Sequence, residues 1–145
     1  MERGAPKDLK VWVNGTFDVL HRGHVELLEY ASKFGTVRVG IDTDERVKIF
    51  KGSERPVNNW VDRSYLIRSL KFVDSVVPFS SDDELEIEIA LWSPEYMIVG
   101  SDYKDKKVIG SHLCNNVLFF NRIKDYSSTK IINYGKDISN RGNMY

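Results

Sequence analysis

The sequence lacks the features that mark several broad classes of protein. Among its 145 residues there is one cysteine, Cys114, so a disulfide within the chain is excluded and a reducing compartment is the simpler expectation. No apolar run approaches the roughly 18 residues of a membrane-spanning helix, and residues 1–10 contain no apolar signal core. We therefore expect a cytoplasmic protein without membrane association.

An excess of charge of one sign is also missing. Lys plus Arg and Asp plus Glu number 21 each, so the net charge is 0 with neutral histidines. Proteins that bind nucleic acid usually carry a basic surface, so we expect no nucleic-acid partner, and any bound anion must be held by a local site. The patterns GxxxxGK[ST] and GxGxxG are absent as well, which disfavours a P-loop kinase and a dehydrogenase.

Short apolar runs alternate with segments of helical periodicity. Strands are expected at 10–15, 36–42, 75–80, 96–100 and 116–121. Helices are expected at 24–34, from Asn58 or Asn59 to about Leu70, from Ser81 through Trp92, and at 127–139. The charged stretch 43–58 has no apolar period and predicts a loop, and the proline in 75–80 suggests a strand at the edge of the sheet.

This alternation predicts an α/β fold, a Rossmann-like three-layer α/β/α domain with a central five-stranded parallel sheet. We expect a single domain over residues 1–145, with a loosely ordered tail from about residue 137. Ligands of such sheets bind outside the carboxyl ends of the strands. Three polar segments follow strands and should meet there: Gly15–Asp18, Asp42–Asp44 and Gly100–Asp102.

Two histidines, His21 and His24, stand just before and within the first expected helix. Three interpretations are open. Together with Asp18 they bind a metal, although a third strong ligand is not obvious. They cap the helix and are purely structural. Or they bind an anion at the helix N-terminus, where imidazolium groups add charge-assisted hydrogen bonds and Gly23 permits close approach of the backbone.

A resemblance decides among these interpretations. The stretch GTFDVLHRGH (15–24) resembles the signature of the cytidylyltransferase-like nucleotidyltransferases, with two histidines separated by any residue and a glycine. The stretch YSSTKII (126–132) resembles the second signature of that family, and WVDRSYLI (60–67) resembles a helix whose arginine lies near the nucleotide phosphates. The resemblance extends over nearly the whole chain.

The resemblance implies a reaction without a covalent enzyme intermediate. A phosphate oxygen of the acceptor attacks the α-phosphorus of a nucleoside triphosphate, and pyrophosphate leaves. The enzyme must stabilise developing negative charge, for which no nucleophilic side chain is needed. Mg²⁺ is expected with the triphosphate, held mainly by phosphate and water with Asp18 nearby, so no metal ligand is assigned to the protein.

The same resemblance assigns roles to individual residues. The catalytic group it implies is His21, His24, Lys48, Lys51 and Arg63. The nucleotide-binding group it implies is Gly15, Thr16, Phe17, Asp18, Gly23, Gly100, Asp102, Arg122, Ser127, Ser128 and Thr129. The substrate-binding residues are Asp42 and Tyr103.

The nucleotide and the acceptor are less sharply indicated. Residues 51–58 and 99–111 resemble loops that flank the sugar-phosphate site in the adenylyl-transferring domain of ADP-heptose synthases. The opening GTFD and Arg122 instead resemble glycerol-3-phosphate cytidylyltransferases, and KDY (124–126) replaces the glycine usual before the second signature. We favour CTP with a sugar or polyol phosphate, with ATP and a heptose 1-phosphate as the alternative.

Two further expectations concern function class and assembly. A nucleotide-binding sensor without turnover is the alternative of another class, but it would not need both histidines, a lysine-bearing loop and an acceptor pocket. The resemblance implies a homodimer. Trp60, Tyr65 and Trp92 are candidates either for its contact surface or for the core.

Overall fold

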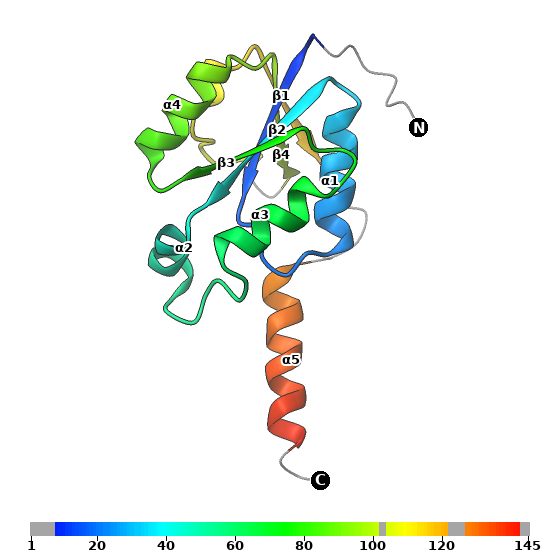
Figure 1. Ribbon diagram of the computed structural model, residues 1–145, viewed down its shortest axis with the longest axis vertical. Coiled ribbons are helices and arrows are strands. Elements are labelled where there is room, and N and C mark those ends of the chain that lie inside the picture. Colours follow the sequence, from blue (N-terminus) through cyan, green and yellow to red (C-terminus); the bar gives the residue numbers. More distant parts are fainter. Residues whose placement is uncertain (1–7, 102–103, 122–126, 143–145) are drawn as a thin grey trace.

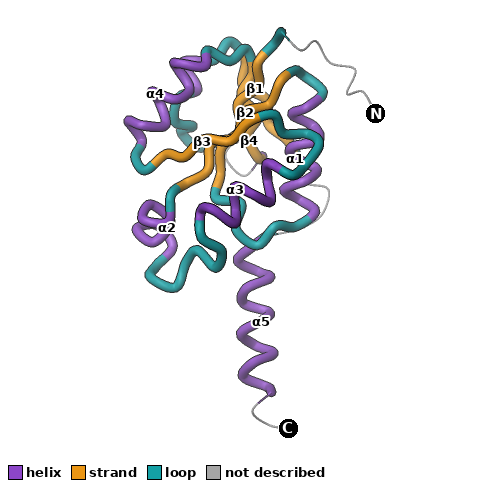
Figure 2. The backbone as a smooth tube through the Cα atoms, in the orientation of Figure 1, coloured by secondary structure: helices purple, strands orange, loops and turns teal. Residues whose placement is uncertain are grey.

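The computed structural model describes residues 8–101, 104–121 and 127–142, the last five of them by backbone only. Its centre is a sheet of five strands (Figures 1 and 2). The strands are β1 (Lys10–Gly15), β2 (Thr36–Asp42), β3 (Ser75–Phe79), β4 (Tyr96–Gly100) and β5 (Asn116–Phe120). All neighbours pair in parallel, in the order β3-β2-β1-β4-β5. The predicted five-stranded parallel sheet is confirmed, and the strand that contains Pro78 does lie at an edge.

Helices cover both faces of this sheet. They are α1 (Arg22–Ser32), α2 (Asp44–Lys51), α3 (Trp60–Arg68), α4 (Asp82–Trp92) and α5 (Ser128–Gly142), with a short 3₁₀ turn at Ser111–Leu113. Side chains alternate across β1, so Val13 packs in one apolar cluster with α1 and α3 while Trp12 packs in another with α4. The central strand is therefore buried on both sides, as a parallel sheet requires.

Helix α2 corrects the prediction that 43–58 is a loop throughout. Thr43 caps it, since its side-chain oxygen accepts a hydrogen bond from the backbone N–H of Arg46 at 3.4 Å. Acidic residues occupy its first turn and Lys48 and Lys51 its last, which matches the helix dipole. Val47 is its one buried residue. A helix with so narrow an apolar face leaves no periodic signal in the sequence.

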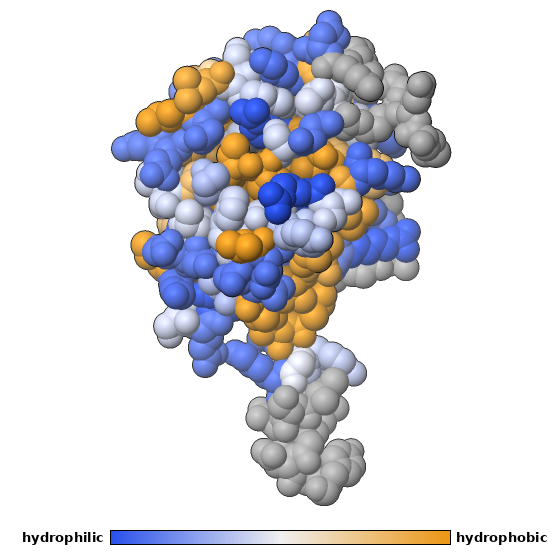
Figure 3. Space-filling model, in the orientation of Figure 1, coloured by the Kyte–Doolittle hydropathy of each residue, from blue (hydrophilic) through white to orange (hydrophobic). Residues whose placement is uncertain are grey.

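The aromatic residues left open by the sequence divide between core and surface. Trp92 is buried, and the indole N–H of Trp60 donates to the carbonyl of Ile41 at 3.0 Å, whereas Tyr65 is 63% exposed. Apolar side chains also reach the surface of α2 and α4 (Figure 3), where Ile49 and Leu91 are exposed. Two of the three aromatics thus serve the core.

The strand order places a crevice at the carboxyl edge of β1 and β4. From β1 the sheet grows outward through β2 and β3 in one direction, whereas β4 and β5 lie on the opposite side of β1. The direction in which strands are added therefore reverses between β1 and β4. Ligands of open α/β sheets bind at such a point. Helix α5 begins at this edge and extends away from the sheet (Figure 1). It continues to Gly142, beyond residue 137, where the sequence predicted a looser tail.

Among the described residues, no helix has both the length and the apolar composition needed to cross a membrane.

Candidate active site

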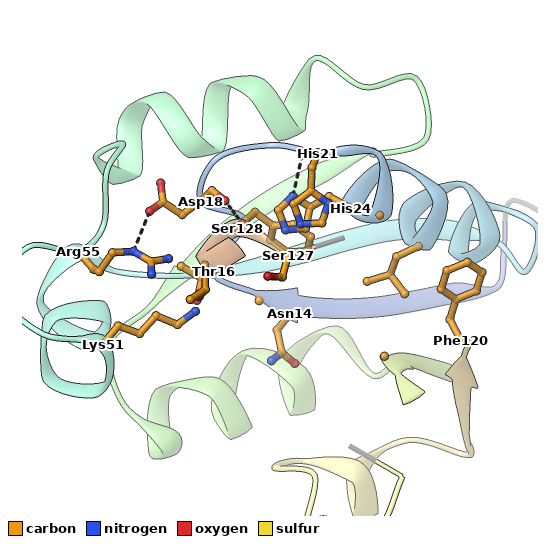
Figure 4. Close-up of a pocket in the computed structure, with 16 residues that line it drawn as sticks. Asn14, Thr16, Asp18, His21, His24, Lys51, Arg55, Phe120, Ser127 and Ser128 are labelled. Carbon is orange, nitrogen blue, oxygen red and sulfur yellow. Dashed lines mark hydrogen bonds and ion pairs between the residues drawn. The ribbon is translucent and has the colours of Figure 1, made fainter. Parts of the chain in front are cut away.

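An open pocket of about 220 Å³ lies at the carboxyl edge of β1 and β4 (Figure 4). It gathers residues from the turn after β1, the start of α1, the end of α2, the end of β4 and the start of α5. Twelve of the residues predicted from the sequence line it: Gly15, Thr16, Phe17, Asp18, His21, Gly23, His24, Lys51, Gly100, Ser127, Ser128 and Thr129. Segments more than 100 residues apart in the sequence therefore form one site.

Three predicted residues that the structure describes do not line this pocket. Lys48 is exposed on α2, Asp42 pairs with Arg46, and Arg63 is buried below the pocket floor. Asp102, Tyr103 and Arg122 fall outside the described residues. Four lining residues were not predicted: Asn14, Leu27, Arg55 and Phe120. Asn14 is the last residue but one of β1 and Phe120 is the last residue of β5, so the strand-end rule that pointed to Gly15 and Gly100 would also have found them.

The two imidazole rings stack on each other. Their centroids are 3.7 Å apart and their planes differ by 21°. The backbone N–H of His21 donates to Nδ1 of His24 at 3.3 Å, so in the neutral His24 ring the proton is on Nε2. His24 thus helps to cap the helix through its Nδ1.

The turn after β1 has an unusual backbone. Phe17 and Val19 both have φ of 51°, a region that a β-branched residue such as Val19 rarely adopts. The ring of Phe17 is buried and meets His24 edge-on at a centroid distance of 5.2 Å. A Cβ at position 15 would lie 3.1 Å from this ring, a tight contact that the ring would have to relieve by moving a few tenths of an ångström. Such strain persists only where the surroundings fix it.

Asp18 makes many of the contacts that hold this strained turn in place. Its buried carboxylate accepts backbone N–H groups from Val57 at 2.7 Å, Asn58 at 2.9 Å and Val19 at 3.1 Å. Arg55 Nε lies 3.5 Å from the same carboxylate. Asp18 therefore ties the first turn to residues 55–58, and these donors occupy the oxygens that were expected near magnesium. No group of three His, Cys, Asp or Glu side chains placed to share a metal occurs among the described residues.

Arg63 supports the same turn from below. Its guanidinium donates to the carbonyl of Thr16 at 2.8 Å, to that of Asn58 at 2.9 Å and to the Asp44 carboxylate at 2.7 Å. These contacts use all three of its nitrogens and leave the side chain fully buried. The structure therefore gives Arg63 a positioning role, in place of the phosphate contact that the sequence suggested.

The start of α5 closes the pocket wall. The Ser128 hydroxyl donates to the carbonyl of Asp18, and the Ser127 hydroxyl accepts from the backbone N–H of Lys130 at 3.0 Å. Both hydroxyls are thus used within the chain, and Thr129 is exposed on the wall. The N-termini of α1 and α5 both border the pocket, and helix N-termini favour phosphate groups through their backbone amides and dipoles.

Charges near the pocket perturb two titratable groups. Desolvation and the nearby Arg55 guanidinium lower the pKa of Lys51, while Asp42 and Asp18 oppose that shift. Desolvation raises the pKa of Asp42 in spite of the neighbouring Arg46, Arg63 and Lys51. The site therefore combines neutral donors, helix N-termini and two cations. Such an arrangement stabilises negative charge on phosphoryl oxygens.

Comparisons with known proteins agree with this chemistry. Residues 12–134 match the model of the family described as cytidylyltransferase-like. A solved lipopolysaccharide core biosynthesis protein from Thermoplasma volcanium GSS1 superposes with a TM-score of 0.63. The match covers 82% of this chain and 98% of that one at 24% identity, so it supports the fold alone.

Curated relatives are closer in sequence. The bifunctional protein HldE of Campylobacter jejuni strain RM1221 is 41% identical over 128 residues, which is 88% of this chain and 28% of that protein. The bifunctional protein HldE of Nitratiruptor is 42% identical over 123 residues, which is 84% of this chain and 26% of that protein. The chain thus spans about a quarter of the length of these relatives. With its sheet, its paired histidines and its family match, the chain belongs to the cytidylyltransferase-like nucleotidyltransferases.

Proposed function

We propose that the protein transfers an adenylyl group from ATP to the phosphate of a sugar 1-phosphate of the heptose type, releasing pyrophosphate. The observation that carries this proposal is the identity of about 41% to HldE proteins over most of this chain. The shared segment corresponds to their adenylyltransferase part, so ATP takes the place of the CTP favoured by the sequence analysis.

The loop that resembles ADP-heptose synthases supports the same choice. Residues 51–58 include Lys51 and Arg55, which line the pocket, and Asp18 ties Val57 and Asn58 to the turn that carries the histidines. The second resembling stretch, 99–111, begins beside the pocket at Gly100. Both features that favour an adenylyltransferase therefore adjoin the site. Of the features that favour a cytidylyltransferase, Arg122 lies outside the described residues.

The residues around the pocket suit a direct displacement. His24 Nε2–H and the backbone amides that open α1 are donors for the α- and β-phosphates, and the amides that open α5 are donors for the outer phosphates. The acceptor brings its own attacking phosphate. Magnesium enters as part of the nucleotide substrate, coordinated by phosphate and water.

Pyrophosphate release tests this proposal. The purified protein is assayed with ATP or CTP, each paired with heptose 1-phosphate, glycerol 3-phosphate or no acceptor. We expect release with ATP and heptose 1-phosphate to exceed every other pair by at least about tenfold, a preference of about 1.4 kcal/mol. Faster release with CTP and glycerol 3-phosphate would favour the cytidylyltransferase. Nucleotide binding without release from any pair would favour a sensor.

A further inference from the structure

Asn14 is a polar and exposed residue in a strand that is otherwise buried. Val11, Trp12 and Val13 of β1 are fully buried, whereas the side chain of Asn14 is exposed and borders the pocket. The central strand of a parallel sheet is usually apolar on both faces. A polar side chain near its carboxyl end therefore faces the space in which ligands of such sheets bind.

Trp12 fixes the orientation of the Asn14 amide. The two residues lie two positions apart and so share one face of β1. The indole Nε1–H of Trp12 donates to Oδ1 of Asn14 at 2.9 Å. Because an indole nitrogen only donates, the amide oxygen has to face Trp12, and the amino group Nδ2 is turned away from it. Nδ2 thus carries two N–H donors that no residue in the described part of the chain accepts.

The indole is itself held in place. Trp12 is fully buried and packs in one cluster with Phe79 and Leu85. On the neighbouring strand, Gly40 is the register partner of Asn14, and a Cβ at Gly40 would lie 2.6 Å from Cζ2 of the indole. Glycine at position 40 therefore leaves room for the ring, and the ring determines the direction of the amide.

Asn14 lies between two groups of pocket residues. Val13 packs on the face of β1 that α1 covers, and α1 carries His24, whereas Asn14 lies on the opposite face with Trp12. Figure 4 shows the imidazoles on one side of the end of β1, Asn14 on the other side, and Lys51 reaching toward the same opening. A phosphoryl group transferred between two substrates has to lie where both of them meet, which places it at this opening.

The chemistry of the transfer calls for a donor at that point. An oxygen of the acceptor phosphate forms a bond to the α-phosphorus while the bond from the α-phosphorus to the bridging oxygen breaks, and pyrophosphate leaves with the electron pair. In the transition state, negative charge spreads over the other oxygens of that phosphorus, where a preorganised donor stabilises it. A hydrogen bond that is stronger in the transition state than in the bound substrate raises kcat.

We propose that Asn14 is a catalytic residue whose Nδ2 donates a hydrogen bond to a non-bridging oxygen of the α-phosphate in the transition state, and that Trp12 is the positioning residue that orients this amide. The inference rests on the proposed function, and it adds a donor from β1 to those of α1 and α5. A purely structural role would need only the amide oxygen, since that atom satisfies the indole.

Steady-state kinetics of two variants separate these roles. Asn14→Ala removes the donor, so we expect kcat to fall about 100-fold with the KM for ATP within about threefold of wild type. Asn14→Asp keeps an oxygen for the indole, so its stability in urea should be near that of wild type, while its kcat should fall at least as far. Asn116→Ala, at an exposed asparagine that begins β5, is the matched control. A normal kcat in Asn14→Ala or in Asn14→Asp overturns the proposal.

A double-mutant cycle tests the part played by Trp12. Trp12→Phe removes the indole N–H, so we expect kcat to fall about tenfold, as for loss of one hydrogen bond. In the Asn14→Ala background the same change should lower kcat no further, because Trp12 acts through the amide. Equal losses in both backgrounds would mean that Trp12 acts through packing alone and would overturn its positioning role.

A binding measurement keeps this inference apart from the proposed function and does not depend on the folding of Trp12→Phe. Isotope-labelled protein is titrated with α,β-methylene-ATP and Mg²⁺, and the side-chain amide signals are followed by NMR, with that of Asn14 assigned from Asn14→Ala. We expect the Asn14 signal to shift and the Asn116 signal to stay. If the Asn14 signal shifts and no pair of substrates releases pyrophosphate, the site stands and the reaction falls. If it does not shift at saturating analogue, the inference falls.

Discussion

The turn after β1 and the end of α2 face each other across the pocket, but their polar atoms are satisfied in different ways. In the turn, Asp18, Arg63 and Ser128 use their side-chain donors and acceptors on backbone groups of the protein. At the end of α2, desolvation and the nearby Arg55 lower the pKa of Lys51, and Arg55, in the loop that follows, keeps a buried nitrogen without a partner among the described residues.

This difference separates residues that build the site from residues that await a ligand. The strained backbone at Phe17 and Val19 is retained because several contacts fix it. The same contacts hold in place the backbone amides of the turn after β1. The loop cations Lys51 and Arg55 lie near the Asp18 carboxylate on the pocket wall.

A motif residue inside the site, such as Arg63, can therefore have a structural role. In His24, Nδ1 accepts the backbone N–H of His21, and the proposed function assigns Nε2 to the phosphates of the nucleotide.

The largest expected effect follows removal of that donor. Asparagine at 24 keeps an acceptor near the place of Nδ1 but lacks Nε2–H, so His24→Asn should fold normally and lower kcat about 100- to 1,000-fold. His24→Gln, which can restore a donor near Nε2, should be less impaired. His112→Asn, at an exposed histidine, is the control for turnover measured by pyrophosphate release. Normal turnover combined with lost stability in His24→Asn would mean that His24 is only a cap.

The next effect concerns stability. Asp18→Ala leaves the backbone N–H groups of Val57 and Asn58 without their acceptor, so we expect unfolding to become about 3 kcal/mol more favourable in urea denaturation. Asp62→Ala, at an exposed aspartate of α3, should change stability by less than about 0.5 kcal/mol. Equal stability of the two variants would contradict the role of Asp18 as an organiser of the site.

Arg63→Met distinguishes support from phosphate binding. The variant leaves the carbonyls of Thr16 and Asn58 and the Asp44 carboxylate without this donor, so we expect a loss of about 2 kcal/mol of stability. Arg68→Met is the exposed control. Calorimetric titration of ATP should give a dissociation constant near that of wild type. Unchanged stability with nucleotide affinity weakened more than about tenfold would restore the contact inferred from the sequence.

The smallest effect belongs to Lys51. Its pKa is lowered in the folded protein from the ordinary 10.5, so the unfolded chain holds this proton more tightly and the charged amine disfavours folding. That penalty is present below the folded-state pKa and vanishes as the pH rises through 10.5. Lys51→Met should therefore be at least as stable as wild type at pH 7, with the difference shrinking above pH 10, although activity falls. Lys48→Met, an exposed change on the same helix, is the control; lower stability of Lys51→Met at pH 7 would contradict the shift.

The sequence predicted most of the fold because its strands are short, apolar and bounded by turn residues. The segments 10–15, 36–42 and 96–100 match the strands of the structure residue for residue. Helix α2 escaped prediction because capping and charge, rather than apolar periodicity, define it. The pocket was predictable through its motif residues. Arg55 lies in the stretch 51–58 that the resemblance placed near the sugar phosphate, but its buried position in the pocket wall appears only after folding.

A crystal structure of the protein with ATP bound tests the central claim most directly. If the turn after β1 binds the phosphates, a triphosphate oxygen lies within about 3.2 Å of Nε2 of His24, and other phosphate oxygens accept hydrogen bonds from the first backbone amides of α1. A triphosphate bound away from both imidazole rings would contradict the account, even if the protein releases pyrophosphate.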